Sequence, residues 1–138
     1  MSLNTGDFGV VGFKDGWGGH YFYSGPSIFV PVSDRFAVIP MGTFQVSPNS
    51  GSWGFAGTVM LEYVGKGNLS LDLVPTIGSE TNNQGNTAVW WGVGPGVTYT
   101  LPGCNMLGVA LQTAGYFGDD WMGLYPMVNF AVPFGGCG

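Results

Sequence analysis

The sequence predicts an all-β protein, an antiparallel up-and-down barrel of about eight strands. Apolar and polar residues alternate with period two in segment after segment. Between residues 68 and 78, for example, Leu69, Leu71 and Leu73 share one face while Ser70 and Asp72 share the other. Clusters of Gly, Asn, Asp, Ser and Pro separate these segments, and no segment has a convincing helical period.

Length and composition limit what the chain can be. Its 138 residues predict one domain, with the barrel in about residues 7–134 and a flexible tail at 135–138. Only 8% of the residues are charged, against about a quarter in a typical soluble domain. With a net charge of −5 and only three lysines and arginines, the chain lacks the basic surface that nucleic acid requires. No nucleic-acid partner is expected.

Eight strand-like runs follow one another along the chain. They span residues 7–13, 21–32, 35–47, 53–64, 68–78, 87–100, 106–117 and 121–134. The connections after the second, fourth and sixth runs are compact, whereas those after the first, third and fifth are glycine-rich, polar and mostly longer. Short turns at one end and longer loops at the other are typical of an up-and-down barrel in an outer membrane.

Each well-defined run has a bulky apolar face and a small or polar face. In the third run the bulky face carries Phe36, Val38, Phe44 and Val46, although Ile39 and Met41 interrupt the alternation. Four further runs have a bulky face of the same kind. In the fourth run it includes Trp53, Phe55, Leu61 and Tyr63, and in the sixth Val89, Val93 and Tyr99. In the seventh run it includes Leu107, Val109 and Leu111, and in the eighth Val128, Phe130, Val132 and Phe134. The opposite faces are mostly Gly, Ala, Thr and Ser.

Two architectures explain such faces, and the charge count favours one of them. In a soluble sandwich or barrel the small polar face meets water, and about a quarter to a third of that surface is charged. In a membrane barrel the bulky face meets lipid and the polar face fills the interior. The runs place few charges on the polar face, so we predict a transmembrane barrel. Its predicted interior polar residues, with Arg35 balancing the two carboxylates, are Arg35, Glu62, Asp72, Gln112 and Asn129.

Aromatic residues at strand ends support the membrane interpretation. Trp53, Tyr63, Tyr99, Phe117 and Phe134 lie on the apolar face near the ends of their runs. Membrane barrels carry aromatic girdles at these positions. Aromatic residues are also common in any β core, so the soluble interpretation stays open.

Five prolines lie near the middle of different runs and challenge a closed barrel. They are Pro26, Pro40, Pro75, Pro95 and Pro126. Proline cannot donate a hydrogen bond to a sheet, and a closed barrel has no edge strand to place it on. We therefore expect a bulge or bend beside each proline; complete interruptions would argue against the strand count and the closed ring.

Three sequence phrases resemble the small, eight-stranded outer-membrane β-barrels of Gram-negative bacteria. They are residues 23–29 followed by 32–36, residues 91–97, and the final run, in which Val128, Phe130, Val132 and Phe134 alternate up to a terminal aromatic residue. The resemblance implies a location in the outer membrane and contact with membrane lipid or detergent. Some members of this family modify lipids, using a histidine with a serine and an acid.

A catalytic or metal site is hard to assemble from this chain. His20 is the only histidine, with Ser24 and Ser27 nearby in sequence, and a triad needs base, nucleophile and orienting acid within hydrogen-bond reach. Cys104 and Cys137 give no metal-binding spacing, although they can pair in an oxidising compartment. We expect no catalytic residues, no metal and no cofactor.

The sequence therefore predicts a non-enzymatic outer-membrane barrel with a structural or surface role, or a very narrow passage. No signal-peptide pattern is visible at the N-terminus, which is compatible with a mature form. The first alternative is a soluble, self-assembling β-rich subunit of a virion, sheath or filament. The second is a lipid-modifying enzyme that uses His20. Self-association is left open.

Overall fold

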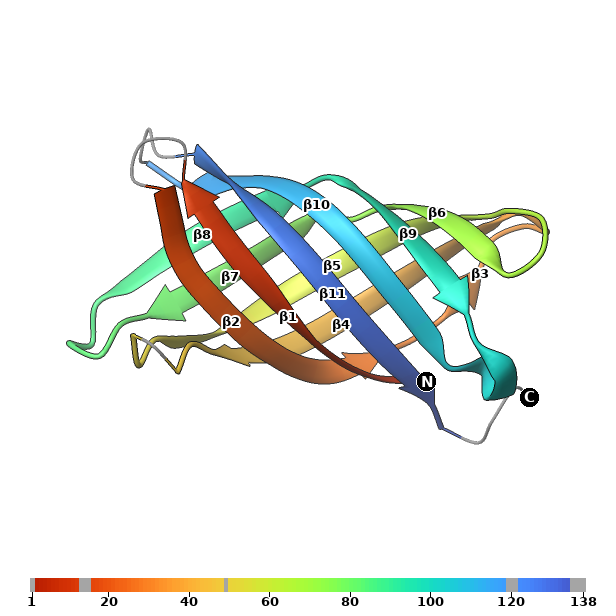
Figure 1. Ribbon diagram of the computed structural model, residues 1–138, viewed down its shortest axis with the longest axis horizontal. Coiled ribbons are helices and arrows are strands. Elements are labelled where there is room, and N and C mark those ends of the chain that lie inside the picture. The colour runs from red at the N-terminus through yellow and green to blue at the C-terminus, as the bar shows by residue number, and fades with distance from the viewer. Residues whose placement is uncertain (1, 13–15, 49, 119–121, 135–138) are drawn as a thin grey trace.

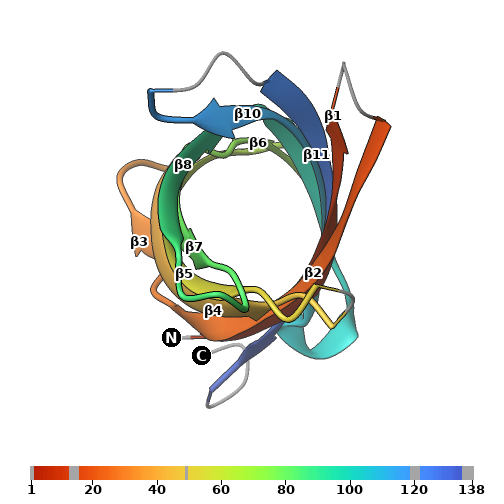
Figure 2. The same ribbon diagram turned by 90° about the vertical axis from the view of Figure 1, so that its left-hand side faces the viewer.

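The strands wind around a single axis and close on themselves. A computed structural model describes residues 2–12, 16–48, 50–118 and 122–134, with side chains described from residue 21 onward in those ranges. The strands are strongly tilted, and seen from the end they form a ring (Figures 1 and 2). A tilt of this kind is what closing a small number of strands into a barrel requires.

Eleven strand segments make up the sheet. They are β1 (Ser2–Gly12), β2 (Gly16–Ser27), β3 (Val30–Pro31), β4 (Phe36–Val46), β5 (Trp53–Val64), β6 (Leu69–Leu73), β7 (Thr76–Thr81), β8 (Thr87–Val93), β9 (Pro95–Thr100), β10 (Met106–Tyr116) and β11 (Met122–Pro133). Because β3 continues β2, β7 continues β6 and β9 continues β8, the 11 segments form 11 − 3 = 8 barrel strands.

Antiparallel pairing runs unbroken around the ring. Each barrel strand pairs with its sequence neighbour, from β1 with β2 to β10 with β11. The last strand then pairs with the first, with Ser2 opposite Pro133 and Gly12 opposite Gly123. The predicted all-β, antiparallel up-and-down barrel is confirmed.

The barrel has two distinct ends. The first residue of β1 and the last of β11 lie at the end that also carries the connections 65–68 and 101–105; we call this the turn end. The opposite, loop end carries the connections 47–52 and 82–86. Cys104 lies at the turn end, beside a short 3₁₀ turn (Pro102–Cys104), and is disulfide-bonded. The other cysteine of the sequence, Cys137, lies outside the described residues.

The strands are longer than the sequence pattern indicates, mainly at the loop end. β1 begins at Ser2, β2 already begins at Gly16, and β7 continues to Thr81. Residues 16–20 and 79–81 therefore belong to the sheet, although their composition predicts loop. Sheet pairing uses backbone groups, which glycine and polar residues supply as well as apolar ones do.

Two of the five prolines, Pro75 and Pro95, lie at breaks between strand segments, and the ring stays closed. β6 and β7 are separated at Val74 and Pro75, and β8 and β9 at Gly94. The two breaks lie side by side, because the Val74 amide donates to the Gly94 carbonyl at 2.9 Å, and the Pro75 carbonyl accepts from the Val59 amide at 3.2 Å. Pro26, Pro40 and Pro126 stay inside β2, β4 and β11.

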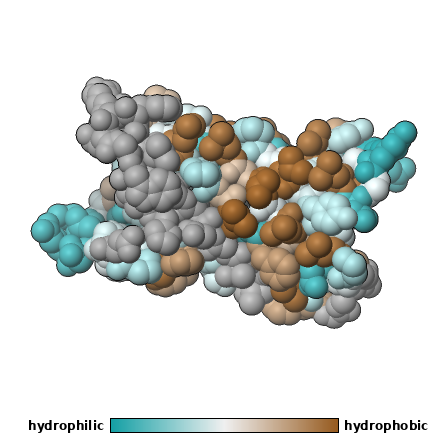
Figure 3. Space-filling model, in the orientation of Figure 1, coloured by the Kyte–Doolittle hydropathy of each residue, from teal (hydrophilic) through white to brown (hydrophobic). Residues whose placement is uncertain are grey.

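The barrel is apolar outside and more polar inside, the reverse of a soluble protein. Large apolar side chains are exposed along the strands, including Phe55, Leu71, Ile77 and Val109. On the face shown in Figure 3, hydrophobic residues gather between the two ends, which carry hydrophilic residues. Ile39 is buried and Met41 half-buried, which places both in the interior and explains why they break the apolar pattern of β4. In the described part of the chain, no helix is long and apolar enough to cross a membrane.

Aromatic side chains cluster on the outer wall near both ends. Near the turn end, Phe36 packs edge-on against Tyr63, with ring centroids 5.2 Å apart. Near the loop end, Trp53 packs against Phe44 and Phe55. Tyr99, Phe117 and Phe134 are also exposed. The outer wall thus carries aromatic residues where a membrane barrel meets the two interfaces.

Candidate functional site: the barrel interior

Inward glycines shape the interior around a few large side chains. A Cβ at Gly78 would lie 2.5 Å from the Trp90 ring, and one at Gly92 would lie 2.8 Å from the Gln112 amide oxygen. Both distances are far inside van der Waals contact. The glycines on the inner faces of β7 and β8 therefore provide the space that the Trp90 ring and the Gln112 side chain occupy over the neighbouring strand.

A tyrosine and carboxylate cluster spans the lumen near the loop end. The hydroxyl of Tyr21 donates to Glu80 Oε1 at 2.5 Å, and that of Tyr116 donates to Glu80 Oε2 at 2.7 Å. These side chains come from β2, β7 and β10, so their hydrogen bonds span the interior. Next to them, the rings of Trp90 and Tyr125 pack with centroids 5.4 Å apart.

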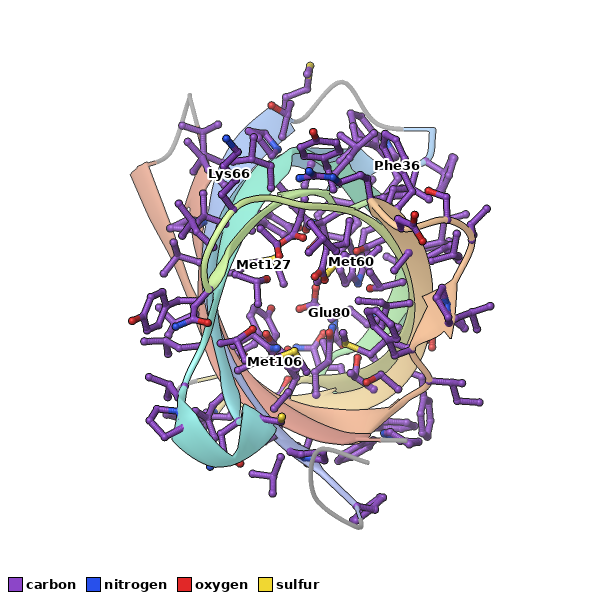
Figure 4. The ribbon with its side chains drawn as sticks, turned by 90° about the vertical axis from the view of Figure 1, so that its right-hand side faces the viewer. Phe36, Met60, Lys66, Glu80, Met106 and Met127 are labelled. Atoms are coloured by element: carbon purple, nitrogen blue, oxygen red, sulfur yellow. The ribbon has the colours of Figure 1, made fainter. Side chains whose placement is uncertain are left out.

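A buried glutamine hydrogen-bonds to a neighbouring part of the inner wall in the middle of the barrel. Gln112 is 0% exposed, and its Nε2 donates to the Val74 carbonyl at 2.6 Å and to Thr76 Oγ1 at 3.0 Å. Thr76 in turn shares a hydrogen bond of 2.9 Å with Thr58. A cavity of about 40 Å³ remains here, lined by Met41, Met60 and Met127 among others. Met60, Met106, Met127 and Glu80 lie within the ring in Figure 4.

Two carboxyl groups face each other toward the turn end. Glu62 on β5 is the cross-strand partner of Asp72 on β6, and both are buried. Thr98 Oγ1 donates to Asp72 Oδ2 at 2.6 Å, and Ser70 hydrogen-bonds to Glu62. We call Glu62 and Asp72 the carboxylate pair.

Four of the five predicted interior polar residues lie in the lumen. Glu62, Asp72 and Gln112 are buried there, and Asn129 is half-buried and accepts a hydrogen bond of 3.0 Å from the Tyr23 hydroxyl. Arg35 does not join them. It is exposed in the turn before β4, which begins only at Phe36, so the strand does not hold its guanidinium inward. The prediction that Arg35 balances the carboxylates is wrong.

The sequence interpretation missed the loop-end cluster. The fifth strand-like run ends at residue 78, so the pattern predicts a loop at Glu80, and it gives no role to Tyr21, Trp90 or Tyr116. The sequence does contain a pattern that indicates an inward Glu80. The two-residue period continues past residue 78, and an even residue number places Glu80 on the same strand face as Asp72, Thr76 and Gly78. Following that period into the apparent loop would have placed Glu80 inside the barrel.

The candidate catalytic residues are only partly described. His20 lies in β2 with its backbone opposite Gly9, but its side chain lies outside the described residues. Ser24 is exposed on the outer wall, whereas Ser27 is buried, so the two serines belong to opposite faces. Among the described residues, no three His, Cys, Asp or Glu side chains form a group that could hold a metal ion.

Comparison with known proteins finds likeness in structure and not in sequence. No protein-family model matches the chain, and no curated protein matches it. The outer membrane enzyme PagL superposes with a TM-score of 0.59 and 11% identity, over 97% of this chain and all (100%) of the PagL chain. Neisserial surface protein A (NspA) superposes with a TM-score of 0.55 and 12% identity, over 96% of each chain.

This chain has the fold of a small outer-membrane β-barrel. The resemblance seen in the sequence is confirmed at the level of the fold. The prediction of a non-enzymatic protein is not upheld, because an outer membrane enzyme shares this fold as well as a surface protein does, so the fold does not exclude an enzymatic activity. A fold of this kind hosts different activities, and barrel shape alone does not decide between them.

Proposed function

We propose that the chain spans an outer membrane as a sealed barrel, which acts through its outer wall and its two rims and does not conduct solutes. The filling of the lumen carries this proposal. Trp90 and Tyr125 meet inside it, Glu80 bridges to Tyr21 and Tyr116, and Gln112 reaches from β10 over β8 to Val74 and Thr76. A small eight-stranded barrel has room for side chains and little else.

The outer wall supports the membrane location. Exposed apolar residues on every described stretch of the wall meet the requirement for a lipid-facing surface, and the closed ring leaves no unpaired strand edge in the hydrocarbon. A soluble, self-assembling subunit would need protein interfaces to cover this whole wall. The likeness to two outer-membrane barrels favours lipid over such interfaces.

Planar bilayer recordings test whether the barrel is sealed. The chain is refolded in detergent micelles, checked for heat-modifiable gel migration, and added to a lipid bilayer. We expect the folded barrel to insert without giving stepwise currents. Stable single-channel currents from the wild-type chain would contradict the sealed lumen, and a monodisperse folded sample in detergent-free buffer would contradict the membrane location.

A second candidate function is lipid modification at the outer wall. The observation that favours it is the likeness to PagL over nearly the full length of both chains. The test is release of fatty acid from outer-membrane lipid by the refolded barrel, compared among His20→Ala, Ser24→Ala and Ser27→Ala. We expect the first two substitutions to abolish release and Ser27→Ala, which changes a buried interior residue, to retain it. Unchanged release by His20→Ala would remove this candidate.

A further inference from the structure

The carboxylate pair lies in a part of the lumen that lacks basic side chains. Glu62 and Asp72 are direct cross-strand partners on the inner face, where like charges oppose each other. Arg35 and Lys66 are both exposed, so among the described side chains no lysine, arginine or histidine enters the interior. Two buried acids therefore face each other without a cation from the described side chains to compensate them.

Each acid of the pair has one hydrogen-bonded oxygen and one without a partner. Glu62 is 6% exposed and Asp72 is 8% exposed. Thr98 and Ser70 hydrogen-bond to the pair, yet Glu62 Oε2 and Asp72 Oδ1 have no hydrogen-bond partner among the described residues. Burying an unpaired carboxylate oxygen is costly, because water no longer solvates it. This arrangement requires a compensating positive charge, supplied either by a bound cation or by a proton on one of the two acids.

Glu80 provides an internal comparison. It is the third acid of the described lumen, and each of its oxygens accepts a hydrogen bond from a tyrosine. Burial of an acid in this barrel therefore does not by itself leave carboxylate oxygens without partners. The feature that distinguishes Glu62 and Asp72 is their mutual approach together with one unpartnered oxygen on each.

The donor atoms point to a hard divalent cation. The pair offers carboxylate oxygens with two formal negative charges, and the hydroxyls of Ser70 and Thr98 lie beside them. Ca²⁺ prefers such oxygen ligands and tolerates irregular geometry, whereas Mg²⁺ demands a near-ideal octahedron. Asp72 also lines one side of the cavity of about 40 Å³, which has the volume for a water molecule beside that carboxyl group. We propose that the barrel binds one Ca²⁺ ion in its lumen, between Glu62 and Asp72.

Calorimetric titration of the full-length chain with CaCl₂ tests this site. The barrel is refolded in a zwitterionic detergent, stripped of metal with a chelator, and titrated alongside Glu62→Gln, Asp72→Asn and Glu80→Gln. We expect one Ca²⁺ per barrel, at least about tenfold weaker binding in each pair variant, and wild-type binding in Glu80→Gln. Ca²⁺ should also raise the thermal unfolding midpoint of the wild type and of Glu80→Gln, but not of the pair variants.

The overturning results are specific to this site. The proposal is overturned if the folded wild type does not bind Ca²⁺. It is also overturned if a double variant that carries both Glu62→Gln and Asp72→Asn binds Ca²⁺ as the wild type does. An infrared band of a protonated carboxylic acid that persists at saturating Ca²⁺ and disappears in Glu62→Gln would overturn it too, because a shared proton would then compensate the pair. The test does not depend on whether the lumen conducts, so its failure is distinguishable from failure of the sealed-barrel proposal.

Discussion

Single inward glycines determine which large residues the lumen accepts. Gly78→Ala places a methyl group against the rigid Trp90 ring, since the added Cβ would lie 2.5 Å from a ring atom. We expect the free energy of unfolding to fall by about 1–3 kcal/mol, the usual cost of overpacking a core. Urea unfolding in lipid vesicles, followed by tryptophan fluorescence, measures it. Gly57→Ala is the matched control, because nothing lies within 4 Å of that Cβ; equal losses in both variants would contradict this explanation.

The tyrosine hydroxyls on Glu80 are individually testable. Tyr116→Phe removes the 2.7 Å hydrogen bond to Glu80 Oε2 and leaves that carboxylate oxygen without its donor. We expect a loss of about 1.5–3 kcal/mol, the range for hydrogen bonds to charged groups. The same unfolding assay applies. Tyr99→Phe, on the exposed outer wall, should change stability by less than about 0.5 kcal/mol, and an effect as large as that of Tyr116→Phe would argue against a special role for the Glu80 cluster.

At the scale of the strands, the two-residue period predicted which face each residue belongs to. It placed Glu62, Asp72 and Gln112 inside and Leu107, Val109 and Leu111 outside, as the structure has them. The period works because a pleated strand imposes it on every residue that the ladder holds. It carries no information about which residue is the first in the ladder.

Arg35 and Glu80 show the consequence at strand ends. Arg35 has inward parity but precedes β4, so its side chain remains in the turn. Glu80 sits among residues typical of loops, yet backbone pairing with Gly54 and Ala88 extends β7 past it. Tertiary pairing decides both ends, and neighbouring strands far away in the sequence supply that pairing. The sequence pattern did not predict the hydrogen bonds of Glu80 across the lumen, because they too depend on strands that are distant in the sequence.

The lipid-facing strands should respond to charge according to depth. Leu111 lies at the centre of β10 and Leu107 near its turn end, and both are exposed on the outer wall. We expect Leu111→Arg to cost about 2–4 kcal/mol and Leu107→Arg about 0–1 kcal/mol, because the penalty for a charge is greatest at the bilayer midplane. Reversible unfolding from phospholipid vesicles gives both values. Equal costs at the two positions would contradict a membrane that crosses β10 in this way.

At the scale of the whole molecule, the strands close into a ring and side chains from opposite walls occupy its lumen. The pairing of β1 with β11 removes every strand edge, and side chains from opposite walls meet within the ring. The described lumen combines three acids, Glu62, Asp72 and Glu80, with no basic side chain. A narrow tube lined in this way focuses negative potential along its axis. The sealed barrel therefore has a built-in charge preference that appears only when its filling is removed.

Removing the largest obstruction should reveal that preference. Trp90 and Tyr125 are buried and pack against each other, so Trp90→Ala combined with Tyr125→Ala takes two rings out of the lumen without changing its charge. We expect this variant to pass small currents that favour K⁺ over Cl⁻, since anions meet three acids and no base inside the tube. The reversal potential across a KCl gradient measures the preference. Adding Glu80→Gln should move that potential toward zero, because it removes one of the acids that repel Cl⁻. An anion-selective leak would mean that the charges lining the open lumen are not those of Glu62, Asp72 and Glu80.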